Sequence, residues 1–185
     1  MSRSASTLAL TLFSVCTACA LELDTAGLAA EEVREPFIAF QRDFSEFMTW
    51  EMHELPDTGV RSGHGSLPPS FMYVTGARAA AFGDPLPVGT MIVRTRENGH
   101  PTEWTVHAMV KRGGGYNAGG ATGWEWFDLR LDDRGAPFIV WRGEGDAADP
   151  GTYGPDVDGT PLACNDCHAF VPSNDFVFTR SLISE

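Results

Sequence analysis

The sequence predicts an α+β fold in one domain, with an N-terminal helix packed on a predominantly antiparallel β-sheet. Apolar residues first recur at helical spacing, which predicts an amphipathic helix. Short segments rich in β-branched and aromatic residues then alternate with turns rich in Gly, Pro, Asp and Asn. Strands joined by short turns pair antiparallel, so these segments predict a single sheet. A chain of 185 residues is long enough to bury a substantial core.

The helix is expected from about Glu31 to Leu55. Glu31 and Glu32 would stand in its first turn, where acidic side chains suit the positive end of the helix dipole. Pro36 is tolerated only near a helix start. An apolar stripe then follows at helical spacing, formed by Val33, Phe37, Phe40, Phe44, Phe47 and Met48. Such a stripe usually packs into the core, with a dimer face as the alternative.

Six segments are expected to form strands because they are rich in β-branched and aromatic residues and are bounded by turn signals. They are Phe71–Thr75, Thr90–Arg96, Glu103–Arg112, Trp124–Leu131, Pro137–Trp141 and Asp175–Arg180. One or two helical turns are expected between the first two strands, at Gly76–Phe82.

Turn signals separate the predicted strands. Asn98-Gly99 is a hairpin signal, and Asp132–Gly135 is typical of a turn. The Gly-rich segment Gly113–Gly123 lacks the Gly-Lys-Ser/Thr of a phosphate-binding loop, so we expect it to connect two strands of a hairpin. Loops rich in Gly and Pro are expected at 56–69 and 143–161.

The chain is acidic, with a formal net charge of −12 from 25 acidic and 13 basic residues. Lys111 is the only lysine, and the basic residues form no cluster in the sequence. This composition disfavours nucleic acid and anionic membrane surfaces as partners. An acidic surface would suit a cationic redox partner, or would simply keep the protein soluble.

The first 20 residues have the composition of a signal peptide. Arg3 precedes the short apolar run Leu8–Val15, and Ala18-Cys19-Ala20 offers small residues for cleavage. The run is too short to span a membrane, and no later run is long or apolar enough to span one. We expect residues 1–20 to be removed, leaving a linker over 21–30 and a domain over 31–185 that is soluble in the periplasm.

Cys19 leaves a second possibility open for the exported chain. It could be the lipidated first residue of a lipoprotein, which would anchor the protein to a membrane surface. Cys16 and Cys19 share the spacing of a metal-binding pair, but they lie inside the targeting segment and predict no metal site.

Cys164-Asn165-Asp166-Cys167-His168 matches the C-x-x-C-H signature of covalent haem attachment. The two thiols would add to the vinyl groups along one porphyrin edge, which places the next residue, His168, at the iron as an axial ligand. A thioredoxin-like redox pair would need a βαβ unit, and structural zinc would need a second ligand pair. Neither is present in the sequence, so it predicts one covalent haem c, with its iron, held by Cys164, Cys167 and His168.

The sixth iron position must be filled from upstream or stay open. Only seventeen residues follow His168, and none is Met or His. The upstream candidates are His53, His64, His100, His107, Met72, Met91 and Met109. A surface or core position is more typical of each of them.

Residues that would surround the haem are less specific. Apolar lining could come from Phe71, Met91, Met109 and Trp126, although all four also suit the core. Glu144, Asp156 and Asp158 precede the motif and could handle a proton, although acidic residues in loops usually lie at the surface.

Several segments occur in a characteristic order before and after the haem motif. They are the predicted helix ending near Trp50, Tyr73-Val74 with its small-residue run, Pro87–Arg94, Met109–Arg112, the Gly-rich loop into Trp124-Glu125-Trp126, and the closing Asp175–Thr179. In this order the chain resembles the cytochrome P-460 and cytochrome c′-beta family over roughly residues 35 to 180. The resemblance implies a β-rich fold with the haem on one face, a periplasmic homodimer, and an open iron that binds nitric oxide.

The resemblance also implies a second activity, because the P-460 branch oxidises hydroxylamine with a lysine cross-linked to the porphyrin. Arg94 stands where that lysine is expected, and a guanidinium is a poor nucleophile. Lys111 is the only amine side chain, on a different predicted strand. Arg94, Lys111 and Asp158 are therefore only weak catalytic candidates. Binding of a small nitrogen oxide is favoured, with hydroxylamine oxidation and plain electron transfer as the alternatives.

Overall fold

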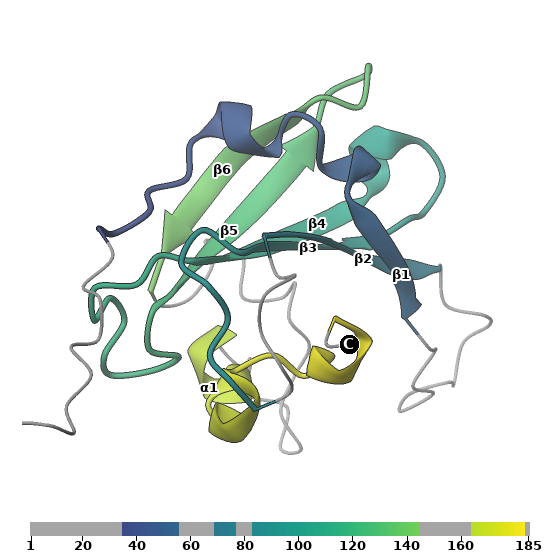
Figure 1. Cartoon of the computed structure of the whole chain (residues 1–185). Coiled ribbons are helices and arrows are strands. Elements are labelled where there is room, and N and C mark those ends of the chain that lie inside the picture. Colours follow the sequence, from purple (N-terminus) through teal and green to yellow (C-terminus); the bar gives the residue numbers. More distant parts are fainter. Residues whose placement is uncertain (1–34, 56–68, 77–82, 145–163, 184–185) are drawn as a thin grey trace, which may run out of the picture. The chain divides into compact units, whose positions relative to one another are not determined.

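A six-stranded antiparallel sheet forms the centre of the computed structural model, which describes residues 35–55, 69–76, 83–144 and 164–183. These residues belong to one compact unit, Val33–Glu185. The strands pair in sequence order as a meander (Figure 1). They are β1 Glu51–Leu55, β2 Ser70–Thr75, β3 Met91–Arg96, β4 Thr105–Lys111, β5 Trp124–Leu131 and β6 Pro137–Gly143. The antiparallel sheet and its last five strands confirm the sequence prediction.

The prediction of a long helix over 31–55 is wrong for the residues that are described. Two short 3₁₀ helices, η1 Gln41–Phe44 and η2 Phe47–Thr49, are followed directly by β1. Pairing of β1 with β2 extends the sheet by one strand, which outweighs the weak helical preference of this segment. Residues before 35 lie outside the described part of the chain.

The apolar stripe of this segment is only partly buried. Phe44 and Phe47 are buried completely or almost completely, whereas Phe40 and Met48 are 48% and 40% exposed. An α-helix would place all of these positions on one face. The 3₁₀ turns and the change to an extended backbone break that periodicity, so Phe40 and Met48 reach the surface.

The final strand expected at Asp175–Arg180 is also absent. The chain there forms the 3₁₀ helices η5 Pro172–Asn174 and η6 Arg180–Leu182, with turns between them. Asp175 and Phe176 have left-handed backbones, with φ of 52° and 64°. A strand cannot continue through two such residues, because strands need negative φ.

The turns between strands follow the sequence prediction closely. Gly113–Gly123 connects β4 to β5 as a hairpin loop, and Asp132 Oδ1 accepts the Arg134 and Ala136 N–H groups in the next turn. The hairpin at Asn98-Gly99 exists, but its connection is longer than two residues and includes η3 Pro101–Glu103. The helical turns expected at Gly76–Phe82 and much of the two Gly/Pro-rich loops fall outside the described residues.

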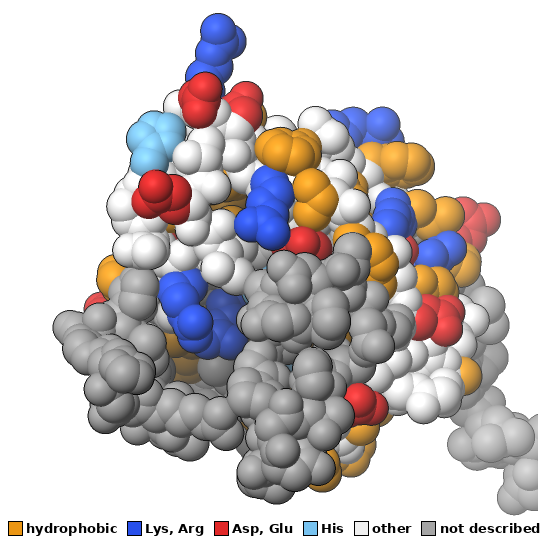
Figure 2. All heavy atoms as spheres, turned by 180° about the vertical axis from the view of Figure 1, so that it is seen from behind, with side chains coloured by type: hydrophobic (Ala, Val, Ile, Leu, Met, Phe, Trp, Pro, Cys, Tyr) orange, Lys and Arg blue, Asp and Glu red, His pale blue; other side chains and the backbone are white. Residues whose placement is uncertain are grey.

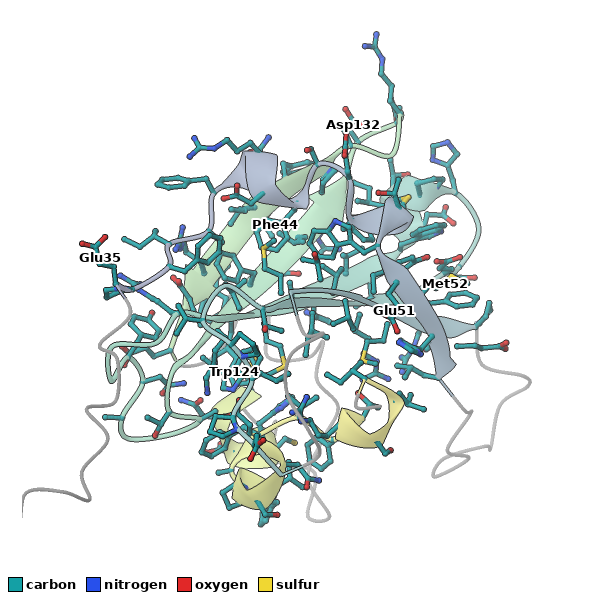
Figure 3. The ribbon with its side chains drawn as sticks, viewed as in Figure 1. Glu35, Phe44, Glu51, Met52, Trp124 and Asp132 are labelled. Carbon is teal, nitrogen blue, oxygen red and sulfur yellow. The ribbon has the colours of Figure 1, made fainter. Side chains whose placement is uncertain are left out.

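The sheet separates two apolar clusters, so its faces have different partners (Figures 1 and 3). We call one the N-terminal face, because residues 37–50 cover it. Phe44 lies there with its ring 5.2 Å from that of Phe127. We call the other the motif face, because the C-terminal segment with the C-x-x-C-H motif packs on it. Trp124, Trp126, Met72, Met109, Cys164 and Val177 belong to the cluster on that face.

Charged and apolar side chains are interspersed on the surface shown in Figure 2. Basic side chains there lie in several separate groups, with acidic and hydrophobic ones between them. Large apolar side chains that reach the surface include Phe138 and Val140 of the edge strand β6. Within the described residues, no helix combines the length and apolar character needed to cross a membrane.

Candidate functional site

The C-x-x-C-H motif forms a single helical turn, α1 Cys164–His168, on the motif face of the sheet. In a helix, residues three and four positions apart share one side, so Cys167 and His168 both lie near Cys164. Cys164 is buried in the apolar cluster, whereas Cys167 and His168 are half-buried. The two cysteines form no disulfide. The motif therefore presents two thiols and one imidazole from one turn of helix.

Asn165, the first variable residue of the motif, fastens this turn to the sheet and to the Gly-rich loop. Its Oδ1 accepts the Trp126 indole N–H at 2.9 Å and the Asn117 amide at 2.7 Å. Its Nδ2 donates to Asn117 Oδ1 at 2.9 Å and to the Glu144 carbonyl. Gly120 makes room for this, because a Cβ there would collide with the Asn165 side chain. The loop thus positions the motif.

His168 is held by a hydrogen bond and by two aromatic rings. Its Nδ1 lies 2.5 Å from the Phe176 carbonyl oxygen, which can only accept, so Nδ1 carries the proton. The Trp126 and Phe178 ring centroids lie 4.6 and 5.2 Å away. Burial lowers the pKa of His168, the charge of Arg94 lowers it further, and the bond to Phe176 opposes both. The neutral imidazole therefore offers Nε2 as a ligand atom.

The turn that supplies the Phe176 carbonyl is braced by contacts to three other segments. Asp175 Oδ1 accepts Lys111 Nζ at 2.5 Å, and its Oδ2 accepts the Leu86 N–H at 2.8 Å. The Asp175 carbonyl accepts the Trp124 indole N–H at 2.8 Å. Lys111 also lies over the Trp124 ring, 5.1 Å from its centroid. Lys111 is thus part of the support for the motif.

A row of polar residues crosses the motif face beside the apolar cluster. Arg94 of β3, His107 of β4 and Asp128 of β5 stand opposite one another in the register. His107 Nδ1 lies 3.8 Å from Asp128 Oδ1. Burial, followed by the charges of Arg94, Arg130 and Arg96, lowers the pKa of His107 to about 4. Arg94 therefore lies where its charge acts on both His107 and His168.

The candidates for a sixth ligand and for apolar lining are divided between the two faces. Met72, Met109 and Trp126 lie in the cluster on the motif face, near Cys164. Phe71 and Met91 pack on the N-terminal face, so of the two alternatives for these residues the structure supports the core position. Alternation along β2, β3 and β4 decides this, because neighbouring residues of a strand point to opposite faces.

The remaining predicted residues contribute little to the site. His53 lies 3.2 Å from Glu51 on β1, and His100 bonds Thr102 in an exposed connection. Glu144 is exposed and contributes its carbonyl rather than its carboxylate. The last three candidates, His64, Asp156 and Asp158, lie outside the described residues.

Sequence reasoning missed Asn165, Asn117 and Phe176 as parts of the site. Phe176 acts through its backbone carbonyl, and no side-chain pattern predicts that. Asn165 occupies a position that the motif leaves variable. A signal existed for Asp175 and Trp124, because both lie in segments that carry the family resemblance, but it named no role for either.

The donor set of the motif fits a c-type haem. Two cysteines that form no disulfide stand on one helical turn, and the adjacent histidine has Nδ1 fixed as a donor and Nε2 left as the ligand atom. Comparisons of the chain with protein-family models, curated proteins and solved structures give no match. What the protein does must therefore be inferred from the motif and its contacts.

Proposed function

We propose that the protein is a periplasmic mono-haem c-type cytochrome of the P-460/c′-beta type, which binds a small nitrogen oxide, nitric oxide, at an open iron position. The observation that carries the proposal is the hydrogen bond from His168 Nδ1 to the Phe176 carbonyl, within a C-x-x-C-H turn. This is the arrangement expected of a histidine that ligates a metal through Nε2.

The residues of the motif have separate tasks in this proposal. Bound haem would supply an iron with a coordination position open to a diatomic ligand. Cys164 and Cys167 would hold the group through thioether bonds, and His168 Nε2 would be its axial ligand. The Phe176 carbonyl makes the imidazole a stronger donor and fixes the plane of its ring. The rings of Trp126 and Phe178 pack against that imidazole.

The contacts of Lys111 favour ligand binding over hydroxylamine oxidation. Its amine is buried in an ion pair with Asp175 and also donates to the Thr122 carbonyl, so it is a poor candidate for a porphyrin cross-link. Arg94 stays protonated and cannot take over that role. Hydroxylamine oxidation also needs a base that takes up the N–H protons.

Two observations favour an open sixth position over plain electron transfer. Met72 Sδ accepts a hydrogen bond from Thr179 Oγ1 at 2.9 Å, which ties up that thioether. Met91 lies on the opposite face of the sheet from the motif. Among the described methionines named as ligand candidates, this leaves Met109, which packs inside the apolar cluster.

Absorption and EPR spectra of the haem-loaded protein, with and without nitric oxide, test this function. We expect a high-spin ferrous protein that converts fully to a nitrosyl form at stoichiometric nitric oxide. A low-spin ferrous spectrum that nitric oxide does not change would contradict the proposal and favour an electron-transfer cytochrome. Robust turnover of hydroxylamine with an artificial electron acceptor would instead favour the P-460 activity.

We also propose that the mature protein is a homodimer, as the family resemblance implies. Phe138 and Val140 on the edge strand β6 are 38% and 46% exposed, which would suit such an interface. Light scattering after size-exclusion chromatography measures the mass of the particle directly. A monomer at tens of micromolar protein would contradict the dimer without affecting the haem proposal.

A further inference from the structure

The carbonyl that holds His168 belongs to a strained turn. Asp175 and Phe176 are consecutive residues with left-handed backbones. Aspartate tolerates this conformation, but a bulky residue such as phenylalanine adopts it only under constraint. Local strain of this kind persists where the surrounding structure enforces it, and it often occurs at functional sites. Contacts to other parts of the chain must therefore enforce this turn.

Asp175 carries the enforcing contacts. Its side chain is 9% exposed, and it meets Lys111 Nζ at 2.5 Å and the Leu86 N–H at 2.8 Å. Lys111 is 11% exposed and comes from the end of β4, 64 positions away in the sequence. Next to it Gly123 has a positive φ, and a Cβ there would lie 3.1 Å from Lys111 Nζ. The absence of a side chain at Gly123 thus leaves space for the Lys111 side chain beside Asp175.

A buried ion pair is a costly way to stabilise a fold, because both charges lose their water. An apolar pair of similar volume would often stabilise the protein as well or better. What an ion pair adds is direction, since each oxygen of Asp175 has one fixed donor. The Lys111–Asp175 contact therefore fixes the orientation of the peptide that follows Asp175, and this peptide leads to the Phe176 carbonyl.

We propose that Lys111 is a positioning residue for the axial ligand: through Asp175 it holds the Phe176 carbonyl against His168 Nδ1, and so sets how strongly the imidazole donates to the iron. This inference rests on the proposed haem function and assigns a role to the only lysine of the chain. The path runs from β4 through one ion pair, one peptide and one hydrogen bond to the ligand.

The test compares Lys111→Met, Lys111→Arg and Asp175→Asn in the haem-loaded protein. Methionine keeps the apolar stem without the charge, and arginine keeps the charge. Asparagine tolerates a left-handed backbone and retains an acceptor for the Leu86 N–H. Arg142→Gln is the matched control, because Arg142 forms an ion pair with the buried Glu125 at 2.7 Å toward the N-terminal face.

Two readouts report on the axial ligand rather than on folding. These are the iron–histidine stretching frequency of the ferrous protein by resonance Raman, and the reduction potential by redox titration. We expect Lys111→Met and Asp175→Asn to lower the frequency and raise the potential. Lys111→Arg, which keeps the charge, should give a frequency and a potential closer to the wild-type values than those of Lys111→Met. Arg142→Gln should change neither readout, even where it lowers the melting temperature.

Unchanged readouts in Lys111→Met and Asp175→Asn, with haem attached, would overturn the inference and leave the proposed function intact. An equal change in Arg142→Gln would also overturn it, because the effect would then be general loosening. Failure of the proposed haem function would give a different result, because mass spectrometry would then find no haem on the wild-type protein. The inference about Lys111 would fail together with that function. If Lys111→Met does not fold, the same two readouts in Asp175→Asn and Lys111→Arg test the inference.

Discussion

Lowering the pH from 7 to 5 should destabilise the folded protein through His107. Burial and the charges of three arginines lower the pKa of this ring, whose side chain is 19% exposed, to about 4, whereas a histidine in an unfolded chain titrates near 6.5. Between these values the unfolded state binds a proton that the folded state does not. The free energy of unfolding therefore falls as the pH falls through this range, and is unaffected by His107 above it.

The size of the effect follows from the two pKa values of His107. At about 1.4 kcal/mol per pKa unit, the gap between 6.5 and about 4 corresponds to about 3 kcal/mol in total. About 2 kcal/mol of this should be lost between pH 7 and pH 5. Asp128 Oδ1, 3.8 Å from the ring, would favour the charged form, but burial and three nearby positive charges outweigh one carboxylate at that distance.

Urea unfolding of the wild type and His107→Gln at pH 7, 6 and 5 measures this effect. Glutamine cannot titrate, so the wild type should lose about 2 kcal/mol more than the variant between pH 7 and pH 5. His100→Gln is the control, because its ring lies in the exposed β3–β4 connection. Identical pH dependence in wild type and His107→Gln would refute the reasoning.

Three further predictions concern other parts of the chain. Phe44→Ala should lower the free energy of unfolding by about 3–5 kcal/mol, because Phe44 is fully buried against Phe127; a loss under 1 kcal/mol in urea unfolding would contradict this. Asn165→Ala should cost about 1–3 kcal/mol by the same measurement, since the buried Trp126 indole loses its acceptor; an unchanged midpoint would contradict the docking role. N-terminal sequencing of the exported protein should begin at Leu21, and a lipid-modified Cys19 would show the alternative.

The strands were predictable because their information is local. Alternating apolar residues between turn signals place β5 at Trp124–Leu131, the same residues that the sequence predicts. The helix prediction failed over residues 35–55, because aromatic spacing alone does not distinguish a helix from a segment packed across a sheet. There the Phe37 N–H donates to the Arg112 carbonyl, a distant partner that helical periodicity cannot reveal.

The site could be predicted only where its functional residues lie close together in the sequence. Cys164, Cys167 and His168 are contiguous enough to form a recognisable motif. Asp175 and Phe176 were expected in a strand but have left-handed backbones. The sequence could not reveal this turn, because the lysine that contacts Asp175 is 64 positions away. Alternation along a strand divides the candidate ligands into two sets, but the packing of the folded sheet decides which set faces the motif.

The most direct test of the central claim is the intact mass of the mature protein, purified from cells that carry the machinery for haem attachment. We predict the mass of the chain plus one haem, retained under denaturing conditions because Cys164 and Cys167 hold it covalently. A Cys164→Ala, Cys167→Ala double variant should lose that mass. An unmodified protein that carries the mass of the bare chain would contradict the claim.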